Sequence, residues 1–289
     1  MAYYVSSGQV SSGIILNDDW MNVYGTAVST TLKSQGCLYV YNGGTATHTT
    51  VNGGDMWIFD GGTAVGTTVD SSGYAIVSGA GSLSNTTVNG GYFLVSSGGM
   101  AADTTAASSG YVIVSSAGSL SNTTVRSGGS VVVDSGGTHT GSLNISGGLF
   151  YVDNGGVVDF DISGKTPDSD VLISDLSRVS GYPSFTVTMS SSQSEGQYKL
   201  AAGTSSFSGS ISVTTESGDV LGTVSIGSNL TVGSLVYSLT VDSGILTFQI
   251  GTEADAPVQD TLLPYTLPQA EYMYVRLRCH VGRHAPGVL

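Results

Sequence analysis

Two aspartates in the repetitive half of the chain are the first residues that could do chemistry. Asp134 and Asp153 each close an apolar run, VVVD and FYVD, at the same place in successive repeats. If these runs are strands in neighbouring layers, the two carboxylates lie side by side and could bind a cation. A solvated pair of carboxylates at two strand ends is the simpler interpretation, so we predict no metal site and no cofactor.

Catalysis on a repetitive β fold would need a denser cluster of acids with a nearby base on one strand face. Between Thr45 and Gly156 the aspartates are dispersed, and Arg126 is the only lysine or arginine. His48 and His139 stand alone in threonine-rich segments, where we expect surface residues. No G-x-S-x-G motif is present, and the segment Gly164–Thr166 lacks the upstream glycine of a P-loop. We therefore predict no catalytic residues and no enzymatic activity.

The C-terminal end carries the remaining side chains of the metal-ligand type. Cys279, His280 and His284 stand in a segment, 252–289, that continues no pattern from upstream. We expect a linker and an irregular tail, truncated or frame-disturbed, with a basic interaction tail as the alternative. Cys37 is the only other cysteine, so no disulfide framework is predicted.

Internal repeats organise the first half of the chain. Each unit has two halves separated by small-residue turns, as in SLSNTTVNGG and YFLVSSGG between Ser82 and Gly99. After the first unit the interval is 18 or 19 residues, which indicates one layer of a solenoid per unit. The units begin near Gln9, Thr26, Thr45, Thr63, Ser82, Met100, Ser119 and Thr138.

The second half of each unit reads as a short strand with an inner and an outer face. Its second and fourth positions are apolar in every copy, and because strand side chains alternate, both are predicted to point inward. The second positions are Leu38, Met56, Ala75, Phe93, Val112, Val131 and Phe150. The fourth positions are Val40, Ile58, Val77, Val95, Val114, Val133 and Val152. In the first halves, residues such as Leu83 and Val88 are expected to do the same.

The third position of these strands should face away from the core, yet it is apolar throughout. Its members are Tyr39, Trp57, Ile76, Leu94, Ile113, Val132 and Tyr151. An exposed apolar stripe is typical of an interaction face, so these are the candidate interaction residues. Tyr74, Tyr92 and Tyr111 should stack beside them on successive layers, and outward threonines such as Thr87 should form a hydroxyl row on the other half. The alternative is that the stripe is covered or only stabilises the sheet.

These patterns predict an all-β fold. Because a unit this short cannot bury its own apolar face, stacked units must form a parallel β-helix, or β-solenoid, of 18–19-residue repeats over residues 1–156. We favour a right-handed helix, with a triangular left-handed one as the alternative. A small antiparallel β cap, or a small sandwich domain, is predicted over 157–251, with a hairpin around Asp242–Gly244. The irregular tail occupies 252–289.

Composition excludes several classes of partner. Only 10% of the residues are charged, the formal net charge is -13, and eight residues are basic. There is no electrostatic footprint for nucleic acid or for an anionic membrane. No apolar run approaches the roughly 18 residues that span a bilayer, so no membrane insertion is expected. The first residues do not read as a signal peptide, so either the export signal lies outside this chain or the chain is a fragment.

The repeats themselves are similar to a known type. Units of the form GG-T-A-x-x-T-T-V-N-G-G followed by Y-x-x-V-S-S-G-G resemble the AIDA-type repeats of autotransporter adhesins, over roughly residues 3–156. The resemblance implies a passenger region of a surface-exposed, self-associating adhesin. It also implies modification of serine and threonine by heptosyltransferases. The family's N-terminal signal and C-terminal barrel are not among these residues, so a fragment or another secretion route is expected.

Together these features predict a non-enzymatic adhesin module of the bacterial surface or a secreted one, of the kind found in biofilms. Its function would be surface attachment and self-association. The expected partners are the protein itself, other surface proteins or glycans, and a Ser/Thr glycosyltransferase. The alternatives are a carbohydrate-active β-helix enzyme and a passive stalk that spaces another domain from the cell.

Overall fold

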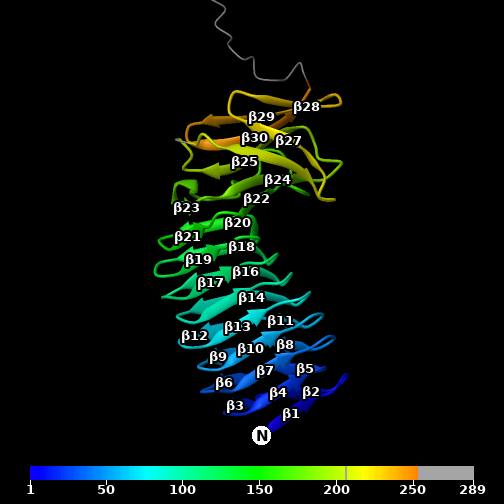
Figure 1. The fold of residues 1–289 in the computed structure, drawn as a ribbon, viewed down its shortest axis with the longest axis vertical. Coiled ribbons are helices and arrows are strands. Elements are labelled where there is room, and N and C mark those ends of the chain that lie inside the picture. Colours follow the sequence, from blue (N-terminus) through cyan, green and yellow to red (C-terminus); the bar gives the residue numbers. More distant parts are fainter. Residues whose placement is uncertain (206, 253–289) are drawn as a thin grey trace, which may run out of the picture. The chain divides into compact units, whose positions relative to one another are not determined.

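The structure, a computed structural model, describes residues 1–205 and 207–252. Strands β1 to β30 fill this part of the chain, with one 3₁₀ turn, η1 (Leu176–Arg178), and no α-helix among the described residues. Figure 1 shows the strands stacked in layers from the N-terminus upward. No helix in the described part is long and apolar enough to cross a membrane. The predicted all-β fold, built on a parallel β-solenoid, is confirmed.

One wall of the solenoid is a ten-stranded sheet made largely from the second halves of the repeats. Every neighbouring pair in it is parallel and in register, so equivalent positions lie directly above one another. In order, its strands are β1 (Ala2–Val5), β4 (Trp20–Val23), β7 (Cys37–Val40), β10 (Asp55–Ile58), β13 (Tyr74–Val77), β15 (Tyr92–Val95), β17 (Tyr111–Val114), β19 (Ser130–Val133), β21 (Leu149–Val152) and β23 (Val179–Gly181).

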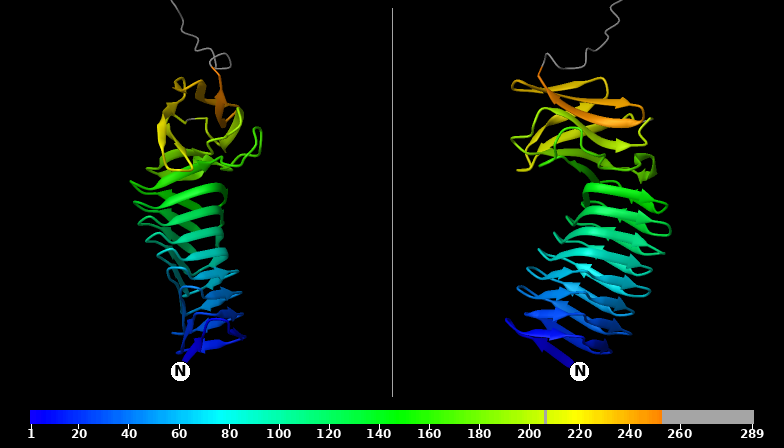
Figure 2. Two further views of the ribbon diagram at one scale, coloured as in Figure 1. Left: turned by 90° about the vertical axis from the view of Figure 1, so that its right-hand side faces the viewer. Right: turned by 180° about the vertical axis from the view of Figure 1, so that it is seen from behind.

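The first halves form a second wall that bends in the middle, and Figure 2 shows the stacked layers from two further sides. Before the bend the early layers have β2 (Val10–Ser12), β5 (Thr26–Val28), β8 (Thr45–Thr47) and β11 (Thr63–Val65). After the bend they have β3 (Ile15–Asn17), β6 (Thr31–Lys33), β9 (Thr50–Asn52) and β12 (Thr68–Asp70). Later layers carry one strand through the bend, namely β14 (Ser82–Asn89), β16 (Met100–Ala107), β18 (Ser119–Arg126) and β20 (Thr138–Ser146).

A residue with positive φ makes each bend. We call these residues the corner row: Gly13, Ser29, His48, Gly66, Asn85, Asp103, Asn122 and Gly141, with φ between 52° and 73°. Glycine, asparagine and aspartate adopt this conformation at the lowest cost, which explains most of the row. At the bend the alternation of inward and outward side chains shifts by one position, so a residue directly after the corner row can point inward. The result is a row of buried threonines: Thr30, Thr49, Thr67, Thr86, Thr104 and Thr123.

The core lies between the two walls, where the repeats predicted it. In the ten-stranded sheet, every second- and fourth-position residue of the strands from β7 to β21 is at most 1% exposed. Leu83 and Val88 of the first halves are fully buried. Each layer therefore contributes aliphatic or aromatic side chains to one continuous cluster. Burial of this apolar surface is the main favourable term that holds the layers together.

The paired glycines at the layer corners have different physical roles. Gly98 has a φ of +79°, and a Cβ there would come no closer than 3.4 Å to a neighbouring heavy atom. Gly99 has an ordinary φ, but a Cβ there would lie 2.5 Å from the Val77 carbonyl oxygen of the layer below. Ala117 takes the place of Gly98 in the next layer, whereas glycine is kept as Gly118. The second glycine of the pair is therefore required, because at that position the backbones of two layers touch.

Beyond Gly156 the parallel ladder continues, although the sequence repeat has ended. We predicted an antiparallel cap over 157–251, and for four of its strands this is wrong. The strand β23 and the strands β22 (Val157–Asp161), β24 (Ser184–Met189) and β26 (Ser210–Thr215) pair parallel with the strand below. Their inward residues, such as Val187 and Val213, keep the period of two that the stack requires.

The antiparallel part at the C-terminal end is confirmed. β26 pairs with β27 (Val220–Ser225), and a four-stranded sheet has the order β25 (Gly196–Ala202), β30 (Ile245–Gly251), β29 (Leu235–Asp242), β28 (Asn229–Val232). The predicted hairpin joins β29 and β30 through Ser243 and Gly244, both with positive φ. The proposed boundaries at 156 and 251 remain predictions, and the tail from 253 lies outside the described residues.

Candidate functional site

The seven candidate interaction residues form one straight row on the ten-stranded sheet, which we call the outer ladder. Each occupies the third position of its strand, and each is in register with the next, from Tyr39 on β7 to Tyr151 on β21. Their neighbours on both sides along the strand are buried, so the ladder faces away from the core. All seven side chains are half-buried, because adjacent layers cover part of each of them.

Aromatic rings gather at the N-terminal end of the outer ladder. Trp57 stacks on Phe59 at 6.2 Å between ring centroids, and Tyr39 stacks on Phe59 at 6.3 Å. Tyr41 lies between Tyr24 and Phe59, with centroid separations of 4.9 and 5.2 Å and nearly parallel planes. The rings thus form one continuous set of stacked contacts. Such contacts add to the stability of neighbouring layers as well as to the surface.

The row of Tyr24, Tyr41 and Phe59 was not foreseen from the sequence. These residues directly follow the fourth position of β4, β7 and β10, at intervals close to the repeat length. That recurrence was the signal that could have identified them. Together with Tyr39 and Trp57 they make the N-terminal third of this wall its most aromatic part.

A second row of aromatic residues lies beside the middle of the outer ladder, at the first strand position. Tyr74 and Tyr92 stack with centroids 5.0 Å apart and planes at 8°, and Tyr111 meets Tyr92 edge-on at 5.9 Å. The predicted stacking is confirmed for Tyr74 and Tyr92, whereas Tyr111 makes an edge contact instead. Tyr74 and Tyr92 are each 46% exposed, more than any member of the outer ladder, so they supply apolar surface that solvent reaches.

Few charges interrupt this face. Asp55 is in register with Cys37 below and Tyr74 above, and burial raises the pKa of its carboxyl. A hydrogen bond with the Cys37 thiol, followed by burial, raises the pKa of Tyr39. Tyr39 is therefore neutral at physiological pH. The low charge and the stacked rings leave the face suited to contact with another weakly polar surface.

The aspartate pair stands where the sequence placed it. Asp134 and Asp153 directly follow β19 and β21, and their backbone N–H groups donate to the carbonyl oxygens of Val114 and Val133 in the layers below. The Asp153 carboxylate accepts a hydrogen bond from the Asn154 N–H at 2.8 Å. Within the described residues no three His, Cys, Asp or Glu side chains are grouped to hold a metal ion. Cys279, His280 and His284 lie outside the described residues.

The two histidines of the repeats differ from each other. His48 is an exposed member of the corner row, as expected. The expectation that His139 is a surface residue is wrong, because its side chain is fully buried. It pairs in register with Leu120 and points into the core, where its ring meets Phe150 edge-on at 5.2 Å. Burial lowers its pKa from 6.5 to about 3.

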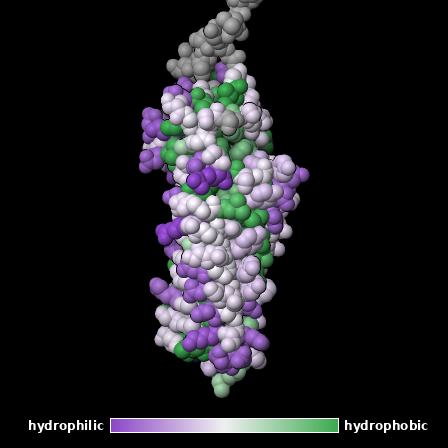
Figure 3. All heavy atoms as spheres, turned by 90° about the vertical axis from the view of Figure 1, so that its left-hand side faces the viewer, coloured by the Kyte–Doolittle hydropathy of each residue, from purple (hydrophilic) through white to green (hydrophobic). Residues whose placement is uncertain are grey.

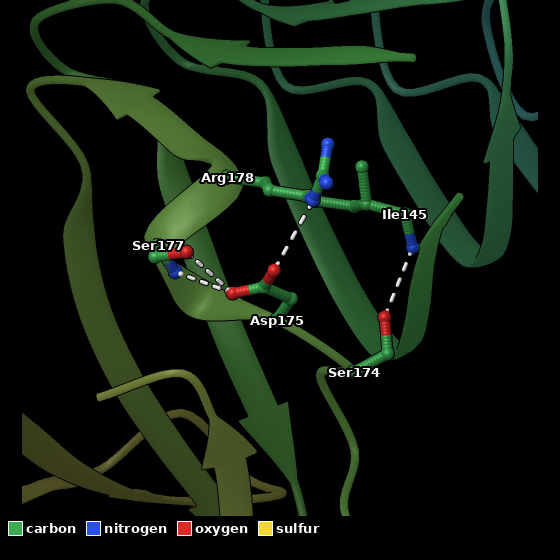
Figure 4. A network of polar contacts seen from close by, with 5 residues as sticks. All are labelled: Ile145, Ser174, Asp175, Ser177 and Arg178. Atoms are coloured by element: carbon green, nitrogen blue, oxygen red, sulfur yellow. Dashed lines mark hydrogen bonds and ion pairs between the residues drawn. The ribbon is translucent and has the colours of Figure 1, made fainter. Parts of the chain in front are cut away.

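The regular stack is interrupted above β18. β20 carries an extra residue, so its register with β18 shifts between Ser121 and Thr123. Above β20 the chain leaves the wall after β22 and returns at Ile173, which bridges to Leu143 below and Ala201 above. Figure 4 shows the anchor of this return: the Ser174 hydroxyl accepts a hydrogen bond from the Ile145 N–H at 3.0 Å.

The next residue fixes the turn that follows. The Asp175 carboxylate accepts from the Ser177 N–H at 3.1 Å, from the Ser177 hydroxyl at 2.6 Å and from Arg178 Nε at 3.1 Å (Figure 4). Hydrogen bonds from Ser177, more than the Arg178 charge, lower the pKa of Asp175. Asp175 therefore caps η1 as an ionised acceptor, and the segment 171–178 is held against the wall.

A groove of about 490 Å³ lies beneath this segment. Its lining includes Asp103 and Asn122 of the corner row, and a second row of Thr105, Thr124 and Asn144 on β16, β18 and β20. Sequence reasoning missed it, because it depends on the extra residue in β20 and on a return segment outside the repeats.

Comparison with known proteins finds solved structures that are similar to this chain. No family model matches the chain, and no curated protein matches it. Among solved structures, the chain is similar to a TibC-catalysed hyper-glycosylated fragment of TibA, with 30% sequence identity. The similarity covers 75% of this chain and 82% of that one, with a TM-score of 0.49.

The space-filling view adds the general character of the surface. The face in Figure 3 is mostly weakly polar, as serine, threonine and glycine make it, with separate apolar clusters and scattered hydrophilic residues. Such a surface offers hydroxyl groups and small apolar areas far more than charge. It suits broad contact of moderate strength.

Proposed function

We propose that this chain is a non-enzymatic adhesin module, located at the bacterial surface or secreted, that mediates attachment and self-association through its ten-stranded sheet. The observation that carries the proposal is the outer ladder, in which equivalent apolar residues line one face through seven successive layers. A soluble solenoid has no need of apolar residues at outward positions, and such stripes are typical of contact surfaces.

The shape of the face supports association with a second copy. Parallel layers in register make a regular surface whose residues repeat along the solenoid axis. Two such surfaces can meet over many layers, so weak contacts per layer add up. Apolar contact contributes roughly 25 cal/mol per Å² before the costs of association. Aromatic residues supply the largest area, so Tyr39, Trp57 and Tyr151 should contribute most.

The repeats support the adhesin assignment and its partners. They resemble the AIDA-type repeats of autotransporter adhesins, whose passengers act at the cell surface. On this basis we also propose a Ser/Thr glycosyltransferase as a partner, which would modify exposed hydroxyls of the walls. Other surface proteins or glycans would be the targets of attachment. Catalysis has no part in this proposal, and contact through the repeated face is sufficient for it.

The test replaces Tyr39, Trp57 and Tyr151 with serine together. Sedimentation velocity should show association weakened roughly tenfold or more, because aromatic contacts at an interface are each worth more than about 1 kcal/mol. Beads coated with the variant should adhere less. The matched control changes Thr50, Thr68 and Thr87, outward residues of the other wall, to serine and should associate as the parent does.

Circular dichroism must show that the aromatic variant keeps its strand signal, with a modest loss of melting temperature from the broken ring stacks. If that folded variant associates as strongly as the parent, the outer ladder only stabilises the sheet and the proposal is wrong.

A further inference from the structure

The groove beneath the segment 171–174 has a chemical character of its own. Among the described residues its lining contains no lysine, arginine or histidine, so it has no complement for an anion. Asp103 is the one carboxylate that the described residues contribute to the lining, which is too little charge for a Ca²⁺ or Mg²⁺ site. An uncharged ligand is the class that remains.

The apolar part of the lining is small. It consists of Leu143, Val171 and Leu172, without an aromatic ring. A largely apolar ligand would leave many polar groups of the groove without partners, at a considerable cost. The volume of about 490 Å³ falls within the range of sites for small ligands. The groove therefore suits a small polar molecule with a limited apolar side.

The polar groups stand in two rows that follow the layers. Asp103 and Asn122 form one row, and Thr105, Thr124 and Asn144 form the other, in successive layers about 4.8 Å apart. A carboxylate only accepts hydrogen bonds, an amide does both, and a hydroxyl does both. A ligand with several hydroxyl groups, each a donor and an acceptor, can use all of them.

One of these groups is already oriented. The Asn122 Oδ1 accepts hydrogen bonds from the Ser142 N–H at 3.1 Å and from the Ser142 hydroxyl at 3.0 Å. The extra residue in β20 brings Ser142 to this place, so the break in the repeat and the orientation of the amide have one origin. With Oδ1 engaged, Nδ2 is the atom of Asn122 that can donate to a ligand.

We propose that this groove binds an uncharged saccharide. Asp103 accepts from sugar hydroxyls, Asn122 donates to them, and the half-buried Val171 covers a C–H face of the ring. The site lies on the bent wall, away from the outer ladder on the other wall, and its argument does not depend on the proposed self-association.

The variants are chosen from the corner row so that the backbone is preserved. Glycine already occupies this row at Gly66 and Gly141, with φ of 73° and 71°. Asn122→Gly and Asp103→Gly therefore remove groove side chains at positions where glycine adopts the required conformation without strain. Asn85→Gly is the matched control, because Asn85 has the same bend, with φ of 53°, but does not line the groove.

The assay applies the full chain to an array of immobilised neutral and sialylated oligosaccharides, with melting by circular dichroism to verify each fold. We expect binding to neutral oligosaccharides, weakened about tenfold by Asn122→Gly and by Asp103→Gly and unchanged by Asn85→Gly. If Asn122→Gly fails to fold, Asp103→Gly decides. The variant with serine at the outer ladder should keep saccharide binding, which separates this site from self-association. No bound saccharide, binding to sialylated glycans alone, or equal loss in Asn85→Gly would overturn the proposal.

Discussion

Acid should destabilise this protein through one buried imidazole. His139 has no exposed surface, and neither Nδ1 nor Nε2 has a hydrogen-bond partner among the residues that the structure describes. Burial penalises its charged form and lowers its pKa to about 3. In the unfolded chain the same side chain is solvated, with a pKa near 6.5. Between these two values the unfolded chain binds a proton that the folded chain does not.

The size of the effect follows from that difference in pKa. Stability is unaffected above about pH 7 and falls as the pH drops below 6.5, by about 1.4 kcal/mol per pH unit. The free energy of unfolding should therefore lose about 2 kcal/mol at pH 5 and about 4 kcal/mol at pH 3 from His139 alone. That is a large fraction of the stability of an ordinary domain.

The measurement compares the parent with His139→Leu by denaturant unfolding at pH 7.5 and pH 5. Leucine stands at the equivalent position as Leu120, so the core accepts it. On going from pH 7.5 to pH 5, the free energy of unfolding of the parent should fall by about 2 kcal/mol more than that of the variant. Burial raises the pKa of Asp159, so its contribution to stability changes with pH in the direction opposite to that of His139. Because Asp159 is present in both proteins, its contribution cancels in the comparison. Equal pH dependence in the two proteins would show that His139 is not buried as a neutral ring.

Two further predictions concern the layers themselves. Gly99→Ala should cost about 3 kcal/mol in the free energy of unfolding, because its Cβ would overlap the Val77 carbonyl. Gly98→Ala should cost only about 1 kcal/mol for its positive φ, and a reversed order in thermal melts would contradict the contact argument. Thr86→Val should raise stability by about 1 kcal/mol, since its buried hydroxyl has no hydrogen-bond partner within the described part of the chain. Thr87→Val on the outside should stay within about 0.5 kcal/mol, and equal gains would contradict the assignment of Thr86 to the inside.

The repeats allowed the core to be predicted residue by residue. Strand alternation needs only the identity of the face, and seven aligned copies identify it without ambiguity, so each inward residue from Leu38 to Val152 is buried. The same alignment also indicated that His139 points inward. It aligns with Leu120 and Leu83, both inward, and the prediction of a surface residue followed its polar type instead of its position.

The bend in the first halves could not be read from alternation. A corner residue such as Asn122 shifts the inward face by one position, which is why Thr123 is buried while Thr124 is outward. The signal for a bend was the recurrence of Asn, Asp and Gly at one place, residues that tolerate positive φ. The layers above Gly156 kept the solenoid geometry without keeping the sequence repeat, so periodicity could not reveal them.

The outer ladder and the groove should respond differently to substitutions, because one is built by the repeat and the other by an interruption of it. The outer ladder is made of equivalent residues in successive layers, so the loss of one member removes a small part of a contact spread over many. The groove exists where the repeat fails, through Ser142 and the return segment at Ile173, and within the described residues this combination occurs in one layer. Single substitutions should therefore reduce self-association gradually but reduce saccharide binding sharply. A solenoid can thus place a cumulative, weakly specific surface and a single, specific site on the same stack of layers.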